Sequence, residues 1–246
     1  VLPQERPVSF IENDTFAIPE HPWGHFHTDA TIRGNLERAI LSIGRVELPS
    51  SPNIPFGGTA FVVGPGLLMT NRHVAELFAQ GLGRRELVFK SGQTAAWDFR
   101  RERNSPANDA TTLKVDDVVM IHPYWDMALL RVSGLRPHQT PLKLSRVSPE
   151  ELVGGEVAVI GYPAKDWRND TELQDQIFAR TYNVKRLHPG KLNGRKLVES
   201  YGKQVSALAH DSSTLGGNSG SAIIDARTGV VVGLHFAGRY LESNYV

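Results

Sequence analysis

The sequence predicts an all-β fold of two antiparallel six-stranded β-barrels, with the functional site in the cleft between them. Short runs that are typical of strands recur along most of the chain, and Gly- and Pro-rich turn signals separate most of them. Few segments have a helical period, which favours closed antiparallel barrels or a sandwich. Residues 133–141 carry Gly134, Pro137 and Pro141 near the middle of the chain. We therefore expect a connection there, with one barrel on each side.

The composition limits the kind of protein. A chain of 246 residues that is 40% hydrophobic, with 23 Gly and 15 Pro, can bury a large core and is rich in turns. Its net charge of +1 gives no electrostatic reason to expect a nucleic-acid or membrane partner. The absence of cysteine excludes disulfides, cysteine-ligated metal sites and a cysteine nucleophile.

Residues 1–34 are expected to form an irregular N-terminal segment, because several prolines punctuate them and their apolar residues have no sustained period. Within this segment His21, His25 and His27 are close enough in sequence to bind a metal ion together. No fourth ligand is evident, so we favour a solvated loop with aromatic anchors and expect no metal.

A helix is expected next, with Asp29 or Thr31 as its N-cap and an apolar face that ends at Gly44. The first barrel should span residues 35–138, and the second residues 139–246. In the first half we expect strands at residues 45–48, 59–63, 66–70, 86–89, 96–99, 115–121 and 127–132, with a helical turn at 72–79. In the second half we expect strands at residues 157–160, 176–179, 182–187, 196–201, 204–210, 221–224 and 230–236.

Ser219 stands in a glycine-rich turn at residues 215–221. Gly217 and Gly220 lack the side chains that would block the approach to its hydroxyl. Such a turn can direct the N–H groups of Gly217 and Ser219 at one point, which is the geometry of an oxyanion hole. Alone, the pattern is weak, because glycine–serine turns are common in surface loops.

A serine nucleophile needs a base and a partner for that base, and His73 and Asp126 are the candidates. His73 follows an apolar strand and opens a helical turn, while Asp126 precedes a mostly apolar strand, where a carboxylate needs hydrogen-bond partners. Asp109, Asp116 and Asp117 are alternatives to Asp126, but they stand in polar stretches. The histidine and aspartate belong to the first barrel and the serine to the second, so the cleft would bring all three together.

These motifs resemble the chymotrypsin-fold, trypsin-like serine peptidases, and most closely the bacterial ones related to glutamyl endopeptidases. The blocks that carry the resemblance are GTAFVVG at 58–64, LMTNRHV at 68–74, DMALLRV at 126–132, TLGGNSGSAI at 214–223 and VGLHFAG at 232–238. The resemblance implies a triad of Ser219, His73 and Asp126, an acyl-enzyme intermediate, an oxyanion hole made by Gly217 and Ser219, and no cofactor. It leaves the compartment open between the bacterial cytoplasm and secretion.

The resemblance also implies a substrate-binding region. The strand after the nucleophile, here Phe236 to Gly238, would bind an extended peptide through its backbone. His235 and Thr214 match the histidine and the hydroxyl residue that face an acidic substrate side chain in glutamyl endopeptidases, which implies a preference for Glu or Asp before the scissile bond. The alternative for His235 is a buried histidine packed in the barrel.

Two alternatives to an independent endopeptidase stay open, and each has a protein or peptide partner. One is a protease-like module that binds a peptide without cutting it, although the intact triad argues against this. The other is a regulated protease domain of a larger signalling or defence protein. In some relatives a processed N-terminal amine docks beside the specificity pocket, a role that Val1 would take here. The family's usual C-terminal helix has no counterpart before the chain ends at Val246.

Overall fold

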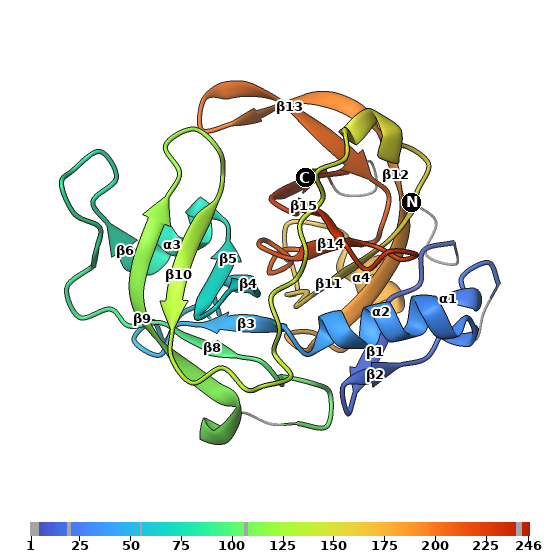
Figure 1. The fold of residues 1–246 in the computed structure, drawn as a ribbon, viewed down its shortest axis with the longest axis horizontal. Coiled ribbons are helices and arrows are strands. Elements are labelled where there is room, and N and C mark those ends of the chain that lie inside the picture. The colour runs from blue at the N-terminus through green and yellow to red at the C-terminus, as the bar shows by residue number, and fades with distance from the viewer. Residues whose placement is uncertain (1–4, 19–20, 55, 106–107, 240–242) are drawn as a thin grey trace.

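The computed structural model describes residues 5–18, 21–54, 56–105, 108–239 and 243–246 (Figure 1). The chain is mostly β and consists of two halves, each built on its own antiparallel sheet, which confirms the predicted fold class. No helix in this described part is both long and apolar enough to span a membrane.

The N-terminal half is a closed six-stranded barrel with the strand order β10-β5-β4-β3-β8-β9. Its strands are β3 (Ile43–Glu47), β4 (Gly58–Gly64), β5 (Leu67–Thr70), β8 (Ala96–Asp98), β9 (Thr112–Ile121) and β10 (Ala128–Val132). Alternate side chains point inward, as in β10, where Ala128, Leu130 and Val132 are buried. Trp97 lies fully buried in this core and donates its indole N–H to the Ala60 carbonyl over 3.1 Å.

Helix α3 (Arg72–Phe78) follows β5 after one residue, and its Val74 and Phe78 pack into the barrel core. The helical turn predicted at 72–79 is therefore confirmed. The smaller elements of this half are β6 (Ala79–Gln80), β7 (Val88–Phe89) and the 3₁₀ turn η1 (Asp109–Thr111).

The C-terminal half is built on a sheet with the order β15-β14-β11-β12-β13-β17-β16. Its strands are β11 (Glu156–Gly161), β12 (Arg186–Ser200), β13 (Lys203–His210), β14 (Ala222–Asp225), β15 (Val231–Leu234), β16 (Ala237–Arg239) and β17 (Ser243–Tyr245). The 3₁₀ turn η2 (Pro149–Leu152) precedes it. We expected six strands here, whereas this sheet has nine in the described chain: seven from this half, and β1 and β2 from the N-terminal segment.

The expectation that residues 1–34 are irregular is wrong for the described part of that segment. β1 (Ser9–Glu12) pairs with β12 and with β2 (Thr15–Phe16), and α1 (His25–Thr28) leads into the next helix. A strand this short is specified by its partner rather than by its own pattern. Its partner β12 is remote in the sequence, so the segment carried no strand signal.

Two neighbouring buried cations lie close to this segment, and Arg186 anchors it directly. The Arg186 guanidinium donates to the carbonyls of Val8 over 2.7 Å and Ser9 over 3.2 Å. The Lys185 ammonium donates to the Phe99 carbonyl over 2.6 Å. Burial lowers the pKa of Arg186 to about 10 and the pKa of Lys185 to about 8. Together these side chains tie the N-terminal segment, the first barrel and the C-terminal sheet to one point.

Helix α2 (Ala30–Ile40) packs between the two halves. Asp29 is its N-cap, as predicted, and accepts the N–H groups of Thr31 over 2.8 Å and Ile32 over 3.1 Å. Its apolar face joins a cluster that includes Phe61 of β4 and Ile160 of β11. The helix thus shares its core with both sheets.

Two expectations for the C-terminal half are wrong. Residues 176–179 do not form a strand, because helix α4 (Thr171–Ile177) occupies the first two of them and the chain turns after it. Asp170 caps this helix by accepting two backbone N–H groups. The strands expected at 182–187 and 196–201 are replaced by the single long strand β12, which pairs with β11 near its start and with β13 further on.

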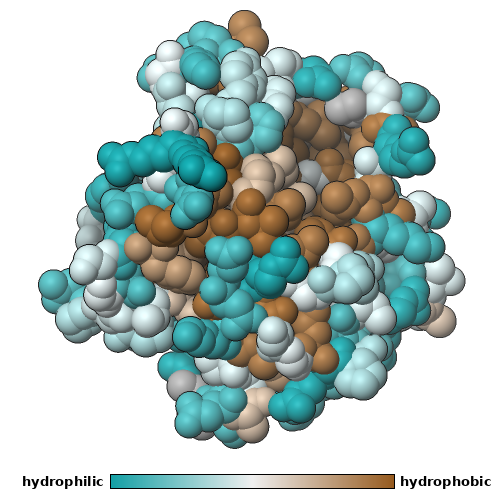
Figure 2. All heavy atoms as spheres, turned by 60° about the vertical axis from the view of Figure 1, so that its left-hand side comes forward, coloured by the Kyte–Doolittle hydropathy of each residue, from teal (hydrophilic) through white to brown (hydrophobic). Residues whose placement is uncertain are grey.

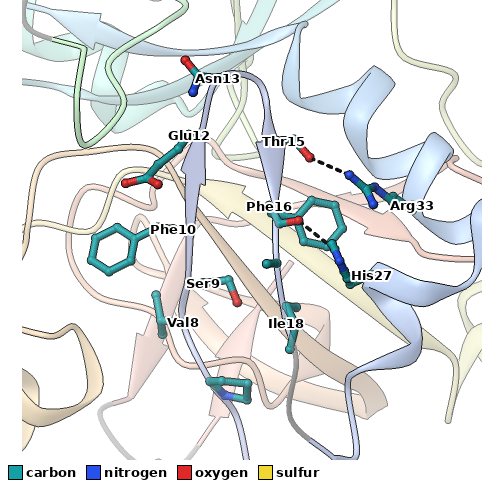
Figure 3. A pocket seen from close by; sticks show the side chains of 12 residues that line it. Val8, Ser9, Phe10, Glu12, Asn13, Thr15, Phe16, Ile18, His27 and Arg33 are labelled. Atoms are coloured by element: carbon teal, nitrogen blue, oxygen red, sulfur yellow. Dashed lines mark hydrogen bonds between the residues drawn. The ribbon is translucent and has the colours of Figure 1, made fainter.

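A pocket of about 630 Å³ lies beside the hairpin of β1 and β2 (Figure 3). Arg33 of α2 donates to Thr15 Oγ1 over 3.3 Å, and His27 Nδ1 of α1 lies 3.0 Å from the Phe16 carbonyl oxygen. Side chains of both helices thus hold β2 in place. His25 instead contacts the Glu156 carboxylate over 2.8 Å. Among the described residues no three His, Cys, Asp or Glu side chains are grouped to hold a metal ion.

The C-terminal sheet buries His188 of β12 completely. Its Nδ1 lies 2.6 Å from the Ser213 carbonyl oxygen, so the ring donates there. Burial and the nearby Arg186 charge lower the pKa of His188 from 6.5 to about 3. The imidazole is therefore neutral in the folded protein at neutral pH.

This burial predicts that the protein loses stability on acidification. Below pH 6.5 His188 binds a proton in the unfolded chain but stays neutral in the folded chain. The stability that is present above that pH is therefore lost as the pH falls toward 3. Between pH 7 and pH 5 we expect the free energy of unfolding, measured by urea denaturation, to fall by about 2 kcal/mol more in the wild type than in His188→Gln.

The matched control is His138→Gln, which changes an exposed histidine and should follow the wild-type pH curve. Parallel pH curves for the wild type and His188→Gln would contradict the prediction.

Candidate active site

His73 and Asp126 lie side by side at one end of the N-terminal barrel. β5 and β10 are neighbours with Thr70 opposite Ala128, so the start of α3 and the residue ahead of β10 come together. His73 Nδ1 lies 2.6 Å from Asp126 Oδ2, and the His73 backbone N–H donates to Asp126 Oδ1 over 2.9 Å. One carboxylate thus holds both the ring and the backbone of one histidine.

The two side chains differ in their exposure to solvent. The Asp126 side chain is 8% exposed, whereas the His73 side chain is 41% exposed. A buried carboxylate needs hydrogen-bond donors, and His73 provides two of them. Asn71 Nδ2 donates to the Asp126 carbonyl over 2.9 Å and fixes the backbone of the same residue. The aspartate is therefore rigidly placed, while the imidazole stays accessible.

The turn that carries Ser219 is held by β4 of the N-terminal barrel. The Thr59 N–H donates to the Ser219 carbonyl over 2.8 Å, and Thr59 Oγ1 donates to the Gly217 carbonyl over 3.0 Å. Gly220 has φ +86°, and a Cβ there would lie 2.0 Å from the Thr59 carbonyl oxygen. Only glycine fits at that position.

This docking brings Ser219 to the His73 side of the barrel. A Cβ on Gly58 would lie 2.7 Å from the Ser219 carbonyl oxygen and 2.8 Å from Val74 Cγ2, so the serine backbone lies against the residue after His73. Within the described chain no hydrogen bond joins the Ser219 hydroxyl to His73 Nε2. Contacts of this kind often tighten only when a ligand is bound.

The backbone around Ser219 presents two free donors. Gly217 adopts φ +84°, and in the part of the chain that is described no acceptor is bonded to the N–H of Gly217 or of Ser219. A Cβ on Gly217 would lie 2.3 Å from the Tyr162 carbonyl oxygen and 2.6 Å from Phe56 Cζ. The turn is therefore packed tightly from behind, and its two N–H groups can stabilise an anionic oxygen.

His235 lies directly behind the turn. Its carbonyl accepts the Gly220 N–H over 2.9 Å, its side chain is buried, and its Nδ1 lies 3.2 Å from His210 Nε2. Burial, with the nearby His210 and His73 rings, holds the pKa of His235 well below its ordinary value of 6.5. The ring is therefore neutral at pH 7.

The other residues expected to bind substrate surround β16. Thr214 Oγ1 donates to Asn244 Oδ1 over 2.6 Å, and the Phe236 N–H donates to the Tyr245 carbonyl over 3.1 Å. Gly238 pairs with Asn244, whose side chain lies where a Cβ on Gly238 would be. β16 ends the strand order, so its second edge has no strand partner among the described residues.

The sequence did not identify His210 and His188 as part of this region. Burial lowers the pKa of His210, as of His188, to about 3. Both stand at inward positions of strands, where an apolar residue is expected, and that mismatch was the available signal. For His188 this signal was hidden, because the strand expected from the sequence ended at residue 187, whereas β12 continues through His188.

The N-terminal segment reaches the same region. The Arg6 guanidinium forms an ion pair with Asp211, and Ser213 Oγ donates to the Arg6 carbonyl over 3.0 Å. Thr214 follows immediately in the chain. Val1, for which we expected docking near the specificity pocket, lies outside the described residues.

A cavity of about 150 Å³ lies between the halves, next to Asp126. Trp125 and Met127 line it from the N-terminal half, and Phe236 and Val246 from the C-terminal half. Figure 2 shows hydrophobic side chains gathered in a hollow across one face, with hydrophilic side chains around it. The molecule can thus offer both apolar surface and polar groups to a ligand.

The sequence is similar to those of known peptidases. The family described as trypsin-like peptidase domain matches residues 58–234. A probable serine protease of Lysobacter enzymogenes is 25% identical over 236 residues, which cover 85% of this chain and 60% of that protein. A glutamyl endopeptidase of Staphylococcus epidermidis is 29% identical over 197 residues, which cover 77% of this chain and 58% of that protein. The chain thus spans about three fifths of the length of these relatives.

Solved structures share the fold. The inactive form of the Rv3671c protease from M. tuberculosis has a TM-score of 0.56 at 20% identity, covering 88% of this chain and 87% of that one. Deg5 has a TM-score of 0.57 at 18% identity, covering 88% of both chains. The family match covers most of the chain, including the segments around His73, Asp126 and Ser219. The chain therefore belongs to the family of trypsin-like peptidase domains.

Proposed function

We propose that this serine endopeptidase cuts peptide bonds with Ser219 as nucleophile, His73 as base and Asp126 as the partner of that base. The observation that carries the proposal is the double contact of Asp126 with His73, at 2.6 Å to Nδ1 and 2.9 Å to the backbone nitrogen. Such a contact keeps the proton on Nδ1 and the lone pair on Nε2. A serine hydroxyl is a weak nucleophile and needs a base of this kind.

The reaction follows from these roles. Ser219 Oγ attacks the carbonyl carbon of the scissile bond while His73 Nε2 takes the hydroxyl proton. The carbonyl oxygen becomes an oxyanion, which the N–H groups of Gly217 and Ser219 stabilise. Collapse of the intermediate breaks the C–N bond, and His73 returns the proton to the leaving amine. A water molecule then attacks the acyl-enzyme by the same route and releases the acid.

The substrate would bind as an added strand along the second edge of β16, with backbone hydrogen bonds to the segment from Phe236 to Gly238. Its acidic side chain would meet His235, and Thr214 would donate to it after turning its hydroxyl away from Asn244 Oδ1. With the shared proton on His210 Nε2, His235 Nδ1 accepts, and Nε2–H is left to donate to a carboxylate. This arrangement supports a preference for Glu or Asp before the scissile bond.

The first test is active-site labelling. A fluorophosphonate probe should label the wild type, and Ser219→Ala should abolish labelling and lower kcat by about 10⁴-fold or more. Asp126→Asn should keep the fold and lower kcat by about 10⁴-fold, because the wrong tautomer of His73 is then favoured. Ser133→Ala removes an exposed hydroxyl and serves as the control. An unlabelled wild type with no hydrolytic activity would refute the proposal.

The second test concerns the oxyanion hole and compares two adjacent glycines. Gly217→Ala should lower kcat by about 100-fold or more, because the new methyl group meets Tyr162 and Phe56 and shifts the donor N–H. At Gly216 an added Cβ meets nothing within 4 Å, so Gly216→Ala should keep near-wild-type kcat. Equal kcat values for the two variants would contradict the assigned donor.

The third test is cleavage profiling on a peptide library. We expect peptides with Glu before the scissile bond to be cleaved about 10- to 100-fold more efficiently than those with Leu or Lys, since a charge-assisted hydrogen bond contributes that much. His235→Ala should remove this preference, whereas His138→Ala should keep it. Equal cleavage after Leu, Lys and Glu by the wild type would exclude the acidic preference and leave the triad untouched.

A further inference from the structure

The hairpin of β12 and β13 reaches from the C-terminal half to the N-terminal barrel. Figure 1 shows it arching over the top of the molecule toward the connection between β9 and β10. Two residues form its tip, Tyr201 with φ +51° and Gly202 with φ +69°. Turns with two positive φ angles favour Asn or Gly at the first position, and a bulky aromatic residue there is strained. A tyrosine that persists in this conformation points to a use for its side chain.

The Tyr201 side chain docks on helix α3. Its hydroxyl donates to Glu76 Oε2 over 3.1 Å, and the Arg72 guanidinium carbon lies 3.7 Å from the centre of its ring. On the other side of the tip, the Lys203 ammonium lies 4.8 Å from the ring centre of Tyr124. The tip thus holds two segments of the N-terminal barrel through cation–π contacts and a charge-assisted hydrogen bond.

These two segments are the ones that carry the proposed base and its partner. Arg72 directly precedes His73, and Tyr124 stands two residues before Asp126. Arg72 also joins the segments to each other, since its Nη1 donates to the Pro123 carbonyl over 3.3 Å. The tip therefore contacts residues that flank both His73 and Asp126 in the sequence.

The surroundings of Tyr201 keep its hydroxyl as a donor. Burial, with the charges of Asp126 and Glu76, raises the pKa of Tyr201 far above its ordinary value. Arg72 Nε is paired with Glu76 Oε1 over 2.8 Å, so the carboxylate bonded to Tyr201 is itself fixed. The three side chains form one connected group.

We infer that Tyr201 is a positioning residue that holds Arg72 and Glu76, and through them the alignment of His73 with Asp126. The inference rests on the proposed function, because it assigns His73 and Asp126 their catalytic roles. The C-terminal half then contributes more than the nucleophile, since the tip of its hairpin also sets the geometry of the base.

The test compares substitutions at Tyr201 with Leu197→Ala, which changes a 74% exposed residue of the same hairpin. Rates are measured with a short chromogenic ester, and active sites are titrated with the fluorophosphonate probe. Tyr201→Ala should lower kcat per titrated site about tenfold with KM within about twofold, because misalignment affects the transition state. Tyr201→Phe keeps the ring on Arg72 and should recover most of the rate. Leu197→Ala should match the wild type.

Tyr201→Gly separates positioning from folding. Glycine suits the positive φ of this position, so this variant should have a higher urea midpoint than Tyr201→Ala and an equally low kcat. An unchanged kcat per titrated site in Tyr201→Ala, or a loss confined to the titrated fraction, would overturn the inference while the proposed function stands. A wild type that is neither labelled nor active would refute the proposed function, and the inference with it.

Discussion

Two hydrogen bonds from Thr59 determine where the Ser219 turn lies. Thr59 is on β4 of the N-terminal barrel, and it holds the carbonyls of Ser219 and Gly217 at 2.8 and 3.0 Å. The proposed nucleophile belongs to one half and its proposed base to the other. The site therefore exists only while the two halves keep this relative position. Glycine at 58 and 220 makes such a close approach possible, because any side chain there would meet the backbone of the opposite half.

The interior behind this turn is unusually polar for a barrel core. His188, His210 and His235 are all buried, and burial keeps each of them neutral at pH 7. His188 Nε2 and His210 Nδ1 have no hydrogen-bond partner in the described chain. Neutral imidazoles cost less to bury than charged groups, and they keep hydrogen-bonding capacity close to the cleft. The core of the C-terminal sheet therefore also supplies histidine side chains that can form hydrogen bonds next to the cleft.

The sequence predicted what is encoded locally. His73 and Asp126 stand at strand ends, where a polar residue next to an apolar run is conspicuous, and the glycines around Ser219 mark a turn that other residues could not adopt. The residues that long-range contacts define were not predictable. His210 joins the site through its contact with His235, which is close in space but not in sequence. β1 is a strand only because β12 lies beside it. α4 owes its helical start to the Asp170 cap rather than to its apolar residues.

The pairing of β1 with β12 has a consequence for synthesis. Ser9 lies opposite Leu187, and Arg186 holds the carbonyls of Val8 and Ser9. While the chain emerges from the ribosome, the first barrel can close before residues 186–200 exist, but β1 lacks its partner in the C-terminal sheet until they appear. β1, a strand near the start of this chain, is thus among the last strands to complete its native pairing.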